Sequence, residues 1–119
     1  MPDSAGFPPE VRVRKRREYL AVRAARRSVR DDVLELAWRR TGAGPARLGL
    51  VVPIRGLGAV GRNRIKRVVK EIFRARRGAL PAGYDFVVAP RDRARAADFA
   101  AASASFDALT ARFLARERP

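Results

Sequence analysis

A short run of cations interrupted by an asparagine is the segment of this chain best suited to chemistry. It reads Arg62-Asn63-Arg64-Ile65-Lys66-Arg67, and Lys70 follows closely. Guanidinium groups bind phosphate oxygens in pairs, and an asparagine amide both donates and accepts hydrogen bonds. Such a set suits a phosphate backbone beside a base edge, a 2′-hydroxyl or a hydrated metal ion. The candidate nucleic-acid-binding residues are Arg62, Asn63, Arg64, Lys66, Arg67 and Lys70.

The apolar residues around this run predict a helix over residues 62–77. They repeat at i, i+3, i+4, i+7 and i+8 and are Ile65, Val68, Val69, Ile72 and Phe73. One apolar stripe of this kind anchors a helix to a core and leaves the other face to the cations. The helix start adds unpaired N–H groups and a partial positive charge, which also attract phosphate. Glu71 is the only acid in the segment, so ion pairs along the helix cannot neutralise it.

The charge of the whole chain indicates a polyanionic partner. Its 119 residues include 27 Lys and Arg against 12 Asp and Glu, which leaves a formal charge of +15. A compact body with this charge repels itself unless an anion neutralises it. Nucleic acid is the first candidate and an anionic membrane surface the second. The core needs the helix stripe, which argues against membrane binding, and no apolar run approaches the length of a bilayer span.

The residue types that are missing narrow the chemistry further. The chain has no cysteine and no histidine, which excludes a disulfide framework, a thiolate nucleophile, a Cys/His zinc site and a histidine base. The carboxylates of Glu71, Asp85, Asp92 and Asp98 show no pairing pattern. We therefore expect no catalytic residue, no metal site and no organic cofactor in the protein itself. The absence of cysteine and of a signal-peptide pattern at the start suits a cytoplasmic protein.

Hydropathy patterning predicts a flexible arm at residues 1–10 and a single RNA-binding domain at 11–116. The expected helices cover residues 15–26, 62–77 and 97–116, and the expected strands cover residues 33–39, 47–53 and 84–89. The first two strands are predicted to form a hairpin, and the second, nearly all apolar, to lie centrally in the sheet. Residues 91–95 are expected to be a polar connection. This order predicts an α+β two-layer sandwich with helices on one face of a small mixed sheet.

A glycine-rich loop precedes the cationic helix. Residues 56–61 read Gly-Leu-Gly-Ala-Val-Gly, which matches the dinucleotide-binding pattern G-x-G-x-x-G between a strand and a helix. That site also needs an acid about 20 residues on, after a second parallel strand, whereas Asp85 lies at the start of its predicted strand. A turn at the helix entry explains the glycines better.

These residues also resemble a known family. Gly49-Leu50-Val51-Val52, then Ala59-Val60, then the run from Arg62 to Arg67 are similar to the signature of the ribonuclease P protein family. The spacing from Arg47 to Phe73 fits without a gap. Weaker similarity extends over residues 12–36 and 84–113.

The resemblance implies a fold, a partner and a substrate. In that family a catalytic RNA subunit cuts the 5′ leader from precursor tRNA with magnesium ions held mainly by the RNA, and the protein alone is not expected to cleave. The cationic helix would face the catalytic RNA and its metal ions. The leader would lie in a cleft between the first helix and the sheet, beside Tyr19, Arg23 and Arg55. Arg23 stands where the family has a second aromatic residue, and Ile54-Arg55 where it has two lysines. The family fold also implies a left-handed strand–helix–strand crossover, against the usual right-handed rule.

Two alternatives belong to other classes. A ribosomal-type general RNA-binding protein would use the same fold and charge but leave leader processing untouched. An independent enzyme would need the unpaired carboxylates named above.

Overall fold

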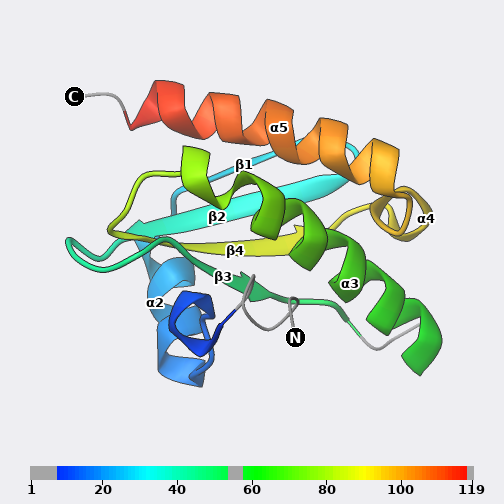
Figure 1. Ribbon diagram of the computed structural model, residues 1–119, viewed down its shortest axis with the longest axis horizontal. Coiled ribbons are helices and arrows are strands. Elements are labelled where there is room, and N and C mark those ends of the chain that lie inside the picture. The colour runs from blue at the N-terminus through cyan, green and yellow to red at the C-terminus, as the bar shows by residue number, and fades with distance from the viewer. Residues whose placement is uncertain (1–7, 54–57, 118–119) are drawn as a thin grey trace.

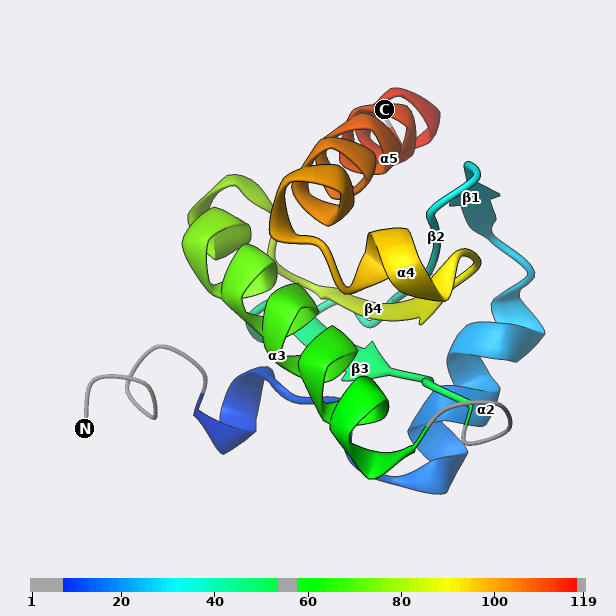
Figure 2. The ribbon, with the colours of Figure 1, turned by 90° about the vertical axis from the view of Figure 1, so that its right-hand side faces the viewer.

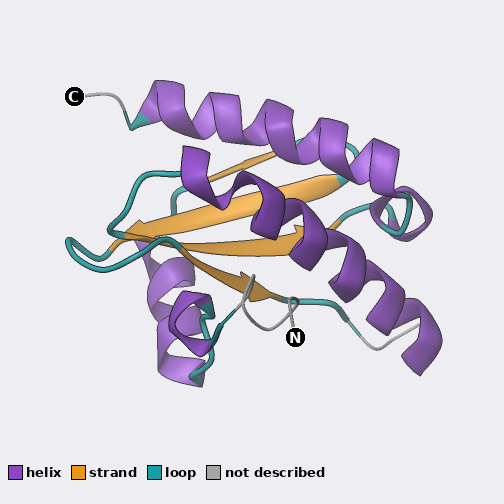
Figure 3. Ribbon diagram, in the orientation of Figure 1, coloured by secondary structure: helices purple, strands orange, loops and turns teal. Residues whose placement is uncertain are grey.

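The chain folds as a four-stranded mixed sheet covered by helices. The computed structural model describes residues 8–53 and 58–117. The helical elements are η1 (Pro9–Val11), α2 (Arg16–Ala25), α3 (Ala59–Arg76), η2 (Arg77–Ala79), α4 (Arg93–Ala96) and α5 (Phe99–Arg116). The strands are β1 (Ser28–Arg30), β2 (Leu34–Arg40), β3 (Arg47–Leu50) and β4 (Tyr84–Pro90), as Figure 3 shows. The predicted α+β class with a mixed sheet is confirmed.

Strand order in the sheet is β1-β2-β4-β3. β2 is antiparallel to both of its neighbours, β1 and β4, and β3 runs parallel to β4. β3, α3 and β4 thus form the strand–helix–strand unit that the resemblance implies, and its left-handed crossover stays a prediction.

One face of the sheet carries the main hydrophobic core. Alternate residues of β2 and β4 point to this face, where α3, α4 and α5 cover them (Figures 1 and 2). Phe113 of α5 lies at its centre, with ring centroids 4.9 Å from Trp38, 5.1 Å from Tyr84 and 5.0 Å from Phe86. All three contacts are edge-on, a favoured geometry for aromatic pairs.

Among the described helices, α2 covers the opposite face. Ala37 on β2 and Val87 on β4 point this way and are half-buried. Val22 is the buried residue of α2, and Figure 2 shows this helix on the side of the sheet away from α3 and α5. The sheet therefore has helices on both faces, one more layer than we expected.

The predicted hairpin of strands 33–39 and 47–53 is wrong. β4 lies between β2 and β3, so the turn at residues 41–46 joins strands that are not hydrogen-bonded to each other. The predicted central place of the second strand is also wrong, because β3 is at the end of the strand order. β3 is apolar because helices cover both of its faces. Its edge away from β4 is also partly covered, since Val13 N–H donates to the carbonyl of Leu48 at 2.9 Å.

The predicted boundaries hold within three residues for the long elements. The helix expected at residues 62–77 begins earlier, at Ala59, because Gly58 is the extended residue before the helix and its carbonyl already accepts from Arg62 N–H at 3.1 Å. The connection expected at residues 91–95 includes the one-turn helix α4, capped by Asp92. β1 was not predicted, since three residues inside a basic stretch carry no alternation signal. Of the predicted arm, residues 1–7 lie outside the described chain, and Pro9–Val11 form a 3-10 helix.

Candidate RNA interface

The amino-terminal turns of α3 stand clear of the protein body. Figure 1 shows them projecting beyond the sheet, and Val60 is 84% exposed. Gly58 precedes the helix and provides no side-chain cap, so within the described residues the first backbone N–H groups of α3 are available to an anion. Ile65, Val69, Ile72 and Phe73 are buried in the core. The predicted division of this helix into an anchored face and a cationic face is confirmed.

Four cations in the amino-terminal half of α3 form no salt bridge with a carboxylate of the described residues. Across residues 8–53 and 58–117, the salt bridges include none to Arg62, Arg64, Lys66 or Arg67. Arg62 Nε donates to the carbonyl of Val52 at 3.3 Å, and Arg64 Nε donates to the carbonyl of Ala97 at 3.2 Å. Each bond orients its guanidinium group through Nε. The two Nη nitrogens of each group can then bind phosphate oxygens.

Lys70 extends the cationic face toward the amino-terminal segment. Partial burial of its ammonium group, followed by the nearby charges of Arg12 and Lys66, lowers the pKa of Lys70. Because the charge of Arg12 acts on Lys70, Arg12 lies close to the α3 cations. Sequence reasoning did not select Arg12. Arg12 is brought there because residues 12–13 run beside β3. We call Arg12, Arg62, Asn63, Arg64, Lys66, Arg67 and Lys70 the α3 basic face.

A groove separates α2 from the sheet. It has a volume of about 240 Å³. The helix contributes Tyr19, Leu20, Val22 and Arg23, with Arg26 and Arg27 at its carboxyl end. The sheet contributes Glu35, Ala37, Val87 and Ala89. The two predicted cleft residues of α2 thus line one groove, whereas Arg55 lies outside the described residues.

The Tyr19 side chain closely approaches the backbone of β3. Its hydroxyl accepts a hydrogen bond from Leu50 N–H at 3.2 Å, and a Cβ at Gly49 would lie 2.8 Å from its ring. Only glycine allows this close approach. The two alternatives for Tyr19, core packing and cleft lining, are therefore both realised: one part of the ring packs on β3 and the residue also borders the groove.

Partly buried ion pairs connect α2, β3 and β4. Arg47 of β3 binds Asp85 of β4 through two contacts of 2.7 Å, and its Nη1 lies 3.2 Å from Glu18 of α2. Asp85 is fully buried. Glu18 also accepts hydrogen bonds from the N–H groups of Lys15 and Arg14, and these bonds together with Arg47 lower its pKa to about 2. This cluster fixes the helix that forms one wall of the groove.

The same cluster excludes the dinucleotide alternative. β4 does supply a second parallel strand, but its acid, Asp85, is enclosed by Arg47 and cannot reach a ribose. Gly61 lies within α3, and Gly56 and Leu57 are outside the described chain. Within the described ranges, no group of three potential metal-ligating side chains occurs, and no helix there has the length and apolar character of a membrane span.

Fold and site together define a class: a small α+β protein that presents a cationic helix and a groove between a helix and a sheet. The family model for ribonuclease P matches residues 7–114. The ribonuclease P protein component of Thermotoga maritima is 37% identical over 87 residues, 73% of this chain and 74% of that protein. The component of Halorhodospira halophila is 39% identical over 115 residues, 95% of this chain and 92% of its own.

Solved structures agree with these matches. The ribonuclease P protein of Thermotoga maritima superimposes with a TM-score of 0.76 at 33% identity, over 85% of this chain and 96% of that one. A ribonuclease P protein of Staphylococcus aureus at 20% identity has the same fold, with a TM-score of 0.76. The chain belongs to the ribonuclease P protein family, and its role is that of a protein component of ribonuclease P, an enzyme of tRNA processing.

Proposed function

We propose that this protein binds the ribonuclease P RNA through the α3 basic face and the 5′ leader of precursor tRNA through the groove beside α2. The observation that carries the proposal is the pairing of two surfaces. One is a cationic helix whose amino-terminal cations have no carboxylate partners among the described residues, and the other is a groove lined by Tyr19 and Arg23. The helix suits folded RNA, and the groove suits a single strand.

Each surface has its own chemical task. The α3 basic face supplies guanidinium and ammonium groups to phosphates, and Asn63 can bond a base edge, a ribose hydroxyl or the water of a hydrated ion. Magnesium ions, which we expect the RNA to hold, would supply the Lewis-acid chemistry of the cleavage. The protein then contributes binding and position. It needs no catalytic residue of its own and no organic cofactor.

Reconstitution tests the proposal. The purified protein, added to a bacterial ribonuclease P RNA, is expected to lower the magnesium concentration needed to cleave precursor tRNA. This decrease should be larger for a substrate with a long leader than for one with a single leader nucleotide. The protein without RNA should leave the substrate intact. An unchanged magnesium requirement with every bacterial RNA tried would refute the proposal and leave general binding of ribosomal RNA as the alternative.

A further inference from the structure

An unpaired carboxylate lies in the groove of this strongly basic protein. Glu35 of β2 is half-buried in the groove wall. Among the described residues it forms no salt bridge and no side-chain hydrogen bond. Even Arg30, its cross-strand neighbour on β1, does not pair with it. The other described carboxylates without such a partner, Glu10 and Asp32, are exposed.

The neighbours of Glu35 leave room above it. Ala37 follows two residues later on the same face of β2, and Ala89 stands opposite Glu35 on β4. Both are small, and Val87 and Val51 add aliphatic surface to the groove. A half-buried carboxylate in such surroundings gains from a ligand that donates hydrogen bonds to it.

The positive and the negative side chains of the groove come from different elements of the fold. The cations Arg23, Arg26 and Arg27 belong to α2 and the residues that follow it, whereas Glu35 belongs to the sheet. The three cations are exposed at the rim. A single strand of RNA would therefore run its phosphates along the rim and turn a base toward Glu35, because the reverse orientation would bring phosphate to a carboxylate.

We propose that Glu35 is a specificity-determining residue, which selects at one leader position a base that carries an amino group and rejects uracil. The proposal rests on the leader binding proposed above. A carboxylate only accepts hydrogen bonds, and cytosine, adenine and guanine each offer it an amino group. Uracil instead has a carbonyl oxygen on each side of its N–H group. These carbonyl oxygens would lie against the carboxylate oxygens and be repelled by them. Cytosine and uracil are the sharpest comparison, since they differ on this edge by the amino group and the adjacent ring nitrogen.

Holoenzyme binding measures this preference. Precursor tRNAs with cytosine or uracil at each leader position in turn would be titrated with the complex of this protein and a ribonuclease P RNA. At one position, we expect binding tighter by about fivefold or more for cytosine. Glu35→Gln should reduce the ratio to less than about twofold, because a glutamine amide can rotate to serve either base.

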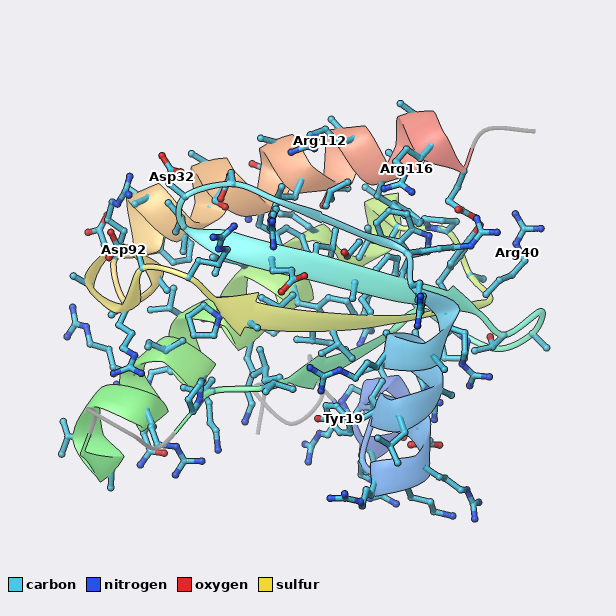
Figure 4. All side chains as sticks on the ribbon, turned by 180° about the vertical axis from the view of Figure 1, so that it is seen from behind. Tyr19, Asp32, Arg40, Asp92, Arg112 and Arg116 are labelled. Carbon is cyan, nitrogen blue, oxygen red and sulfur yellow. The ribbon has the colours of Figure 1, made fainter. Side chains whose placement is uncertain are left out.

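Asp32→Asn is the matched control. It removes one negative charge, as Glu35→Gln does, but Asp32 is exposed and lies at the end of the sheet far from α2 (Figure 4). It should change the affinity for both leaders alike and keep their ratio. Equal binding of both leaders by the wild type, or a ratio that survives Glu35→Gln, would overturn the role of Glu35. Affinity that does not depend on the leader at all would instead refute the proposed leader groove.

Discussion

Arg47 and Asp85 join two parallel strands through a two-point contact, with Nε–Oδ1 and Nη2–Oδ2 distances of 2.7 Å. The Asp85 carboxylate is 1% exposed and the Arg47 side chain 26% exposed. A buried carboxylate of this kind costs much free energy unless it is paired and hydrogen-bonded. Because Arg47 also binds Glu18, the pair fixes α2 as well as the sheet.

Removing the arginine should therefore destabilise the fold. We expect Arg47→Ala to lower the free energy of unfolding by about 3 kcal/mol, since among the described residues it leaves the buried Asp85 only the longer ion pair with Arg39, at 3.4 Å. Urea denaturation at neutral pH measures the change. Arg67→Ala, at an exposed position without a carboxylate partner among the described residues, should stay within about 0.5 kcal/mol of the wild type. Equal effects of the two substitutions would contradict this role of Arg47.

Gly49 and Tyr19 form a second coupled pair. Gly49→Ala should cost about 2 kcal/mol of unfolding free energy, because the new methyl group collides with the anchored tyrosine ring. In a Tyr19→Ala background the same change should cost little, so a double-mutant cycle should show strong coupling. Additive effects would mean that the ring does not lie against Gly49 in solution. Each single variant should also weaken the preference for precursor tRNA with a leader.

The α3 basic face predicts how RNA affinity depends on salt. Arg64→Ala combined with Arg67→Ala should weaken binding to the ribonuclease P RNA and lower the slope of log affinity against log salt by about 1 for each phosphate that the protein no longer neutralises. Arg74→Ala is the comparison, because Arg74 lies at the other end of α3 and pairs with Glu71 at 2.7 Å. If the double variant keeps the wild-type slope, α3 is not the RNA-binding helix.

Glu117 predicts a loss of stability in acid. Burial acts to raise its pKa, but hydrogen bonds from Trp38 and Tyr84 and the pair with Arg27 outweigh it and lower the pKa to about 2. A carboxylate with a lowered pKa stabilises the fold above its unfolded value of 4.5, and the contribution is lost as pH falls from there toward 2. The pKa of Glu18 is also lowered to about 2, so Glu18 adds to the loss of stability over the same pH range.

The measurement compares unfolding free energies between pH 6 and pH 3. The wild type should lose stability over this range, and Glu117→Gln should lose less, since the amide does not titrate. Glu10→Gln, at an exposed residue, should follow the wild-type curve. A curve for Glu117→Gln as steep as that of the wild type would show that Glu117 does not titrate with a lowered pKa.

Other contacts that hold α5 to the sheet were beyond sequence reasoning. Arg112 and Arg116 donate to the carbonyls of Arg30 and Ser28 at 2.9 and 2.8 Å, and Figure 4 shows both on the helix above β1. These bonds occupy two backbone carbonyls of the edge strand β1. Unpaired backbone groups of an edge strand can otherwise pair with another chain.

Local patterns in the sequence determined the three long helices and three of the four strands, because the spacing of apolar side chains depends on the period of each element. They also identified the residues of the α3 basic face that belong to α3, since these residues and the anchoring stripe lie on one continuous helix, but they did not identify Arg12. Strand pairing was decided by tertiary structure: alternation marks a strand but carries no information on its partner, so the place of β4 between β2 and β3 could not be predicted. The groove belongs to the same category. Tyr19, Glu35 and Val87 come from three separate segments, and only the packing of α2 on the far face of the sheet brings them together.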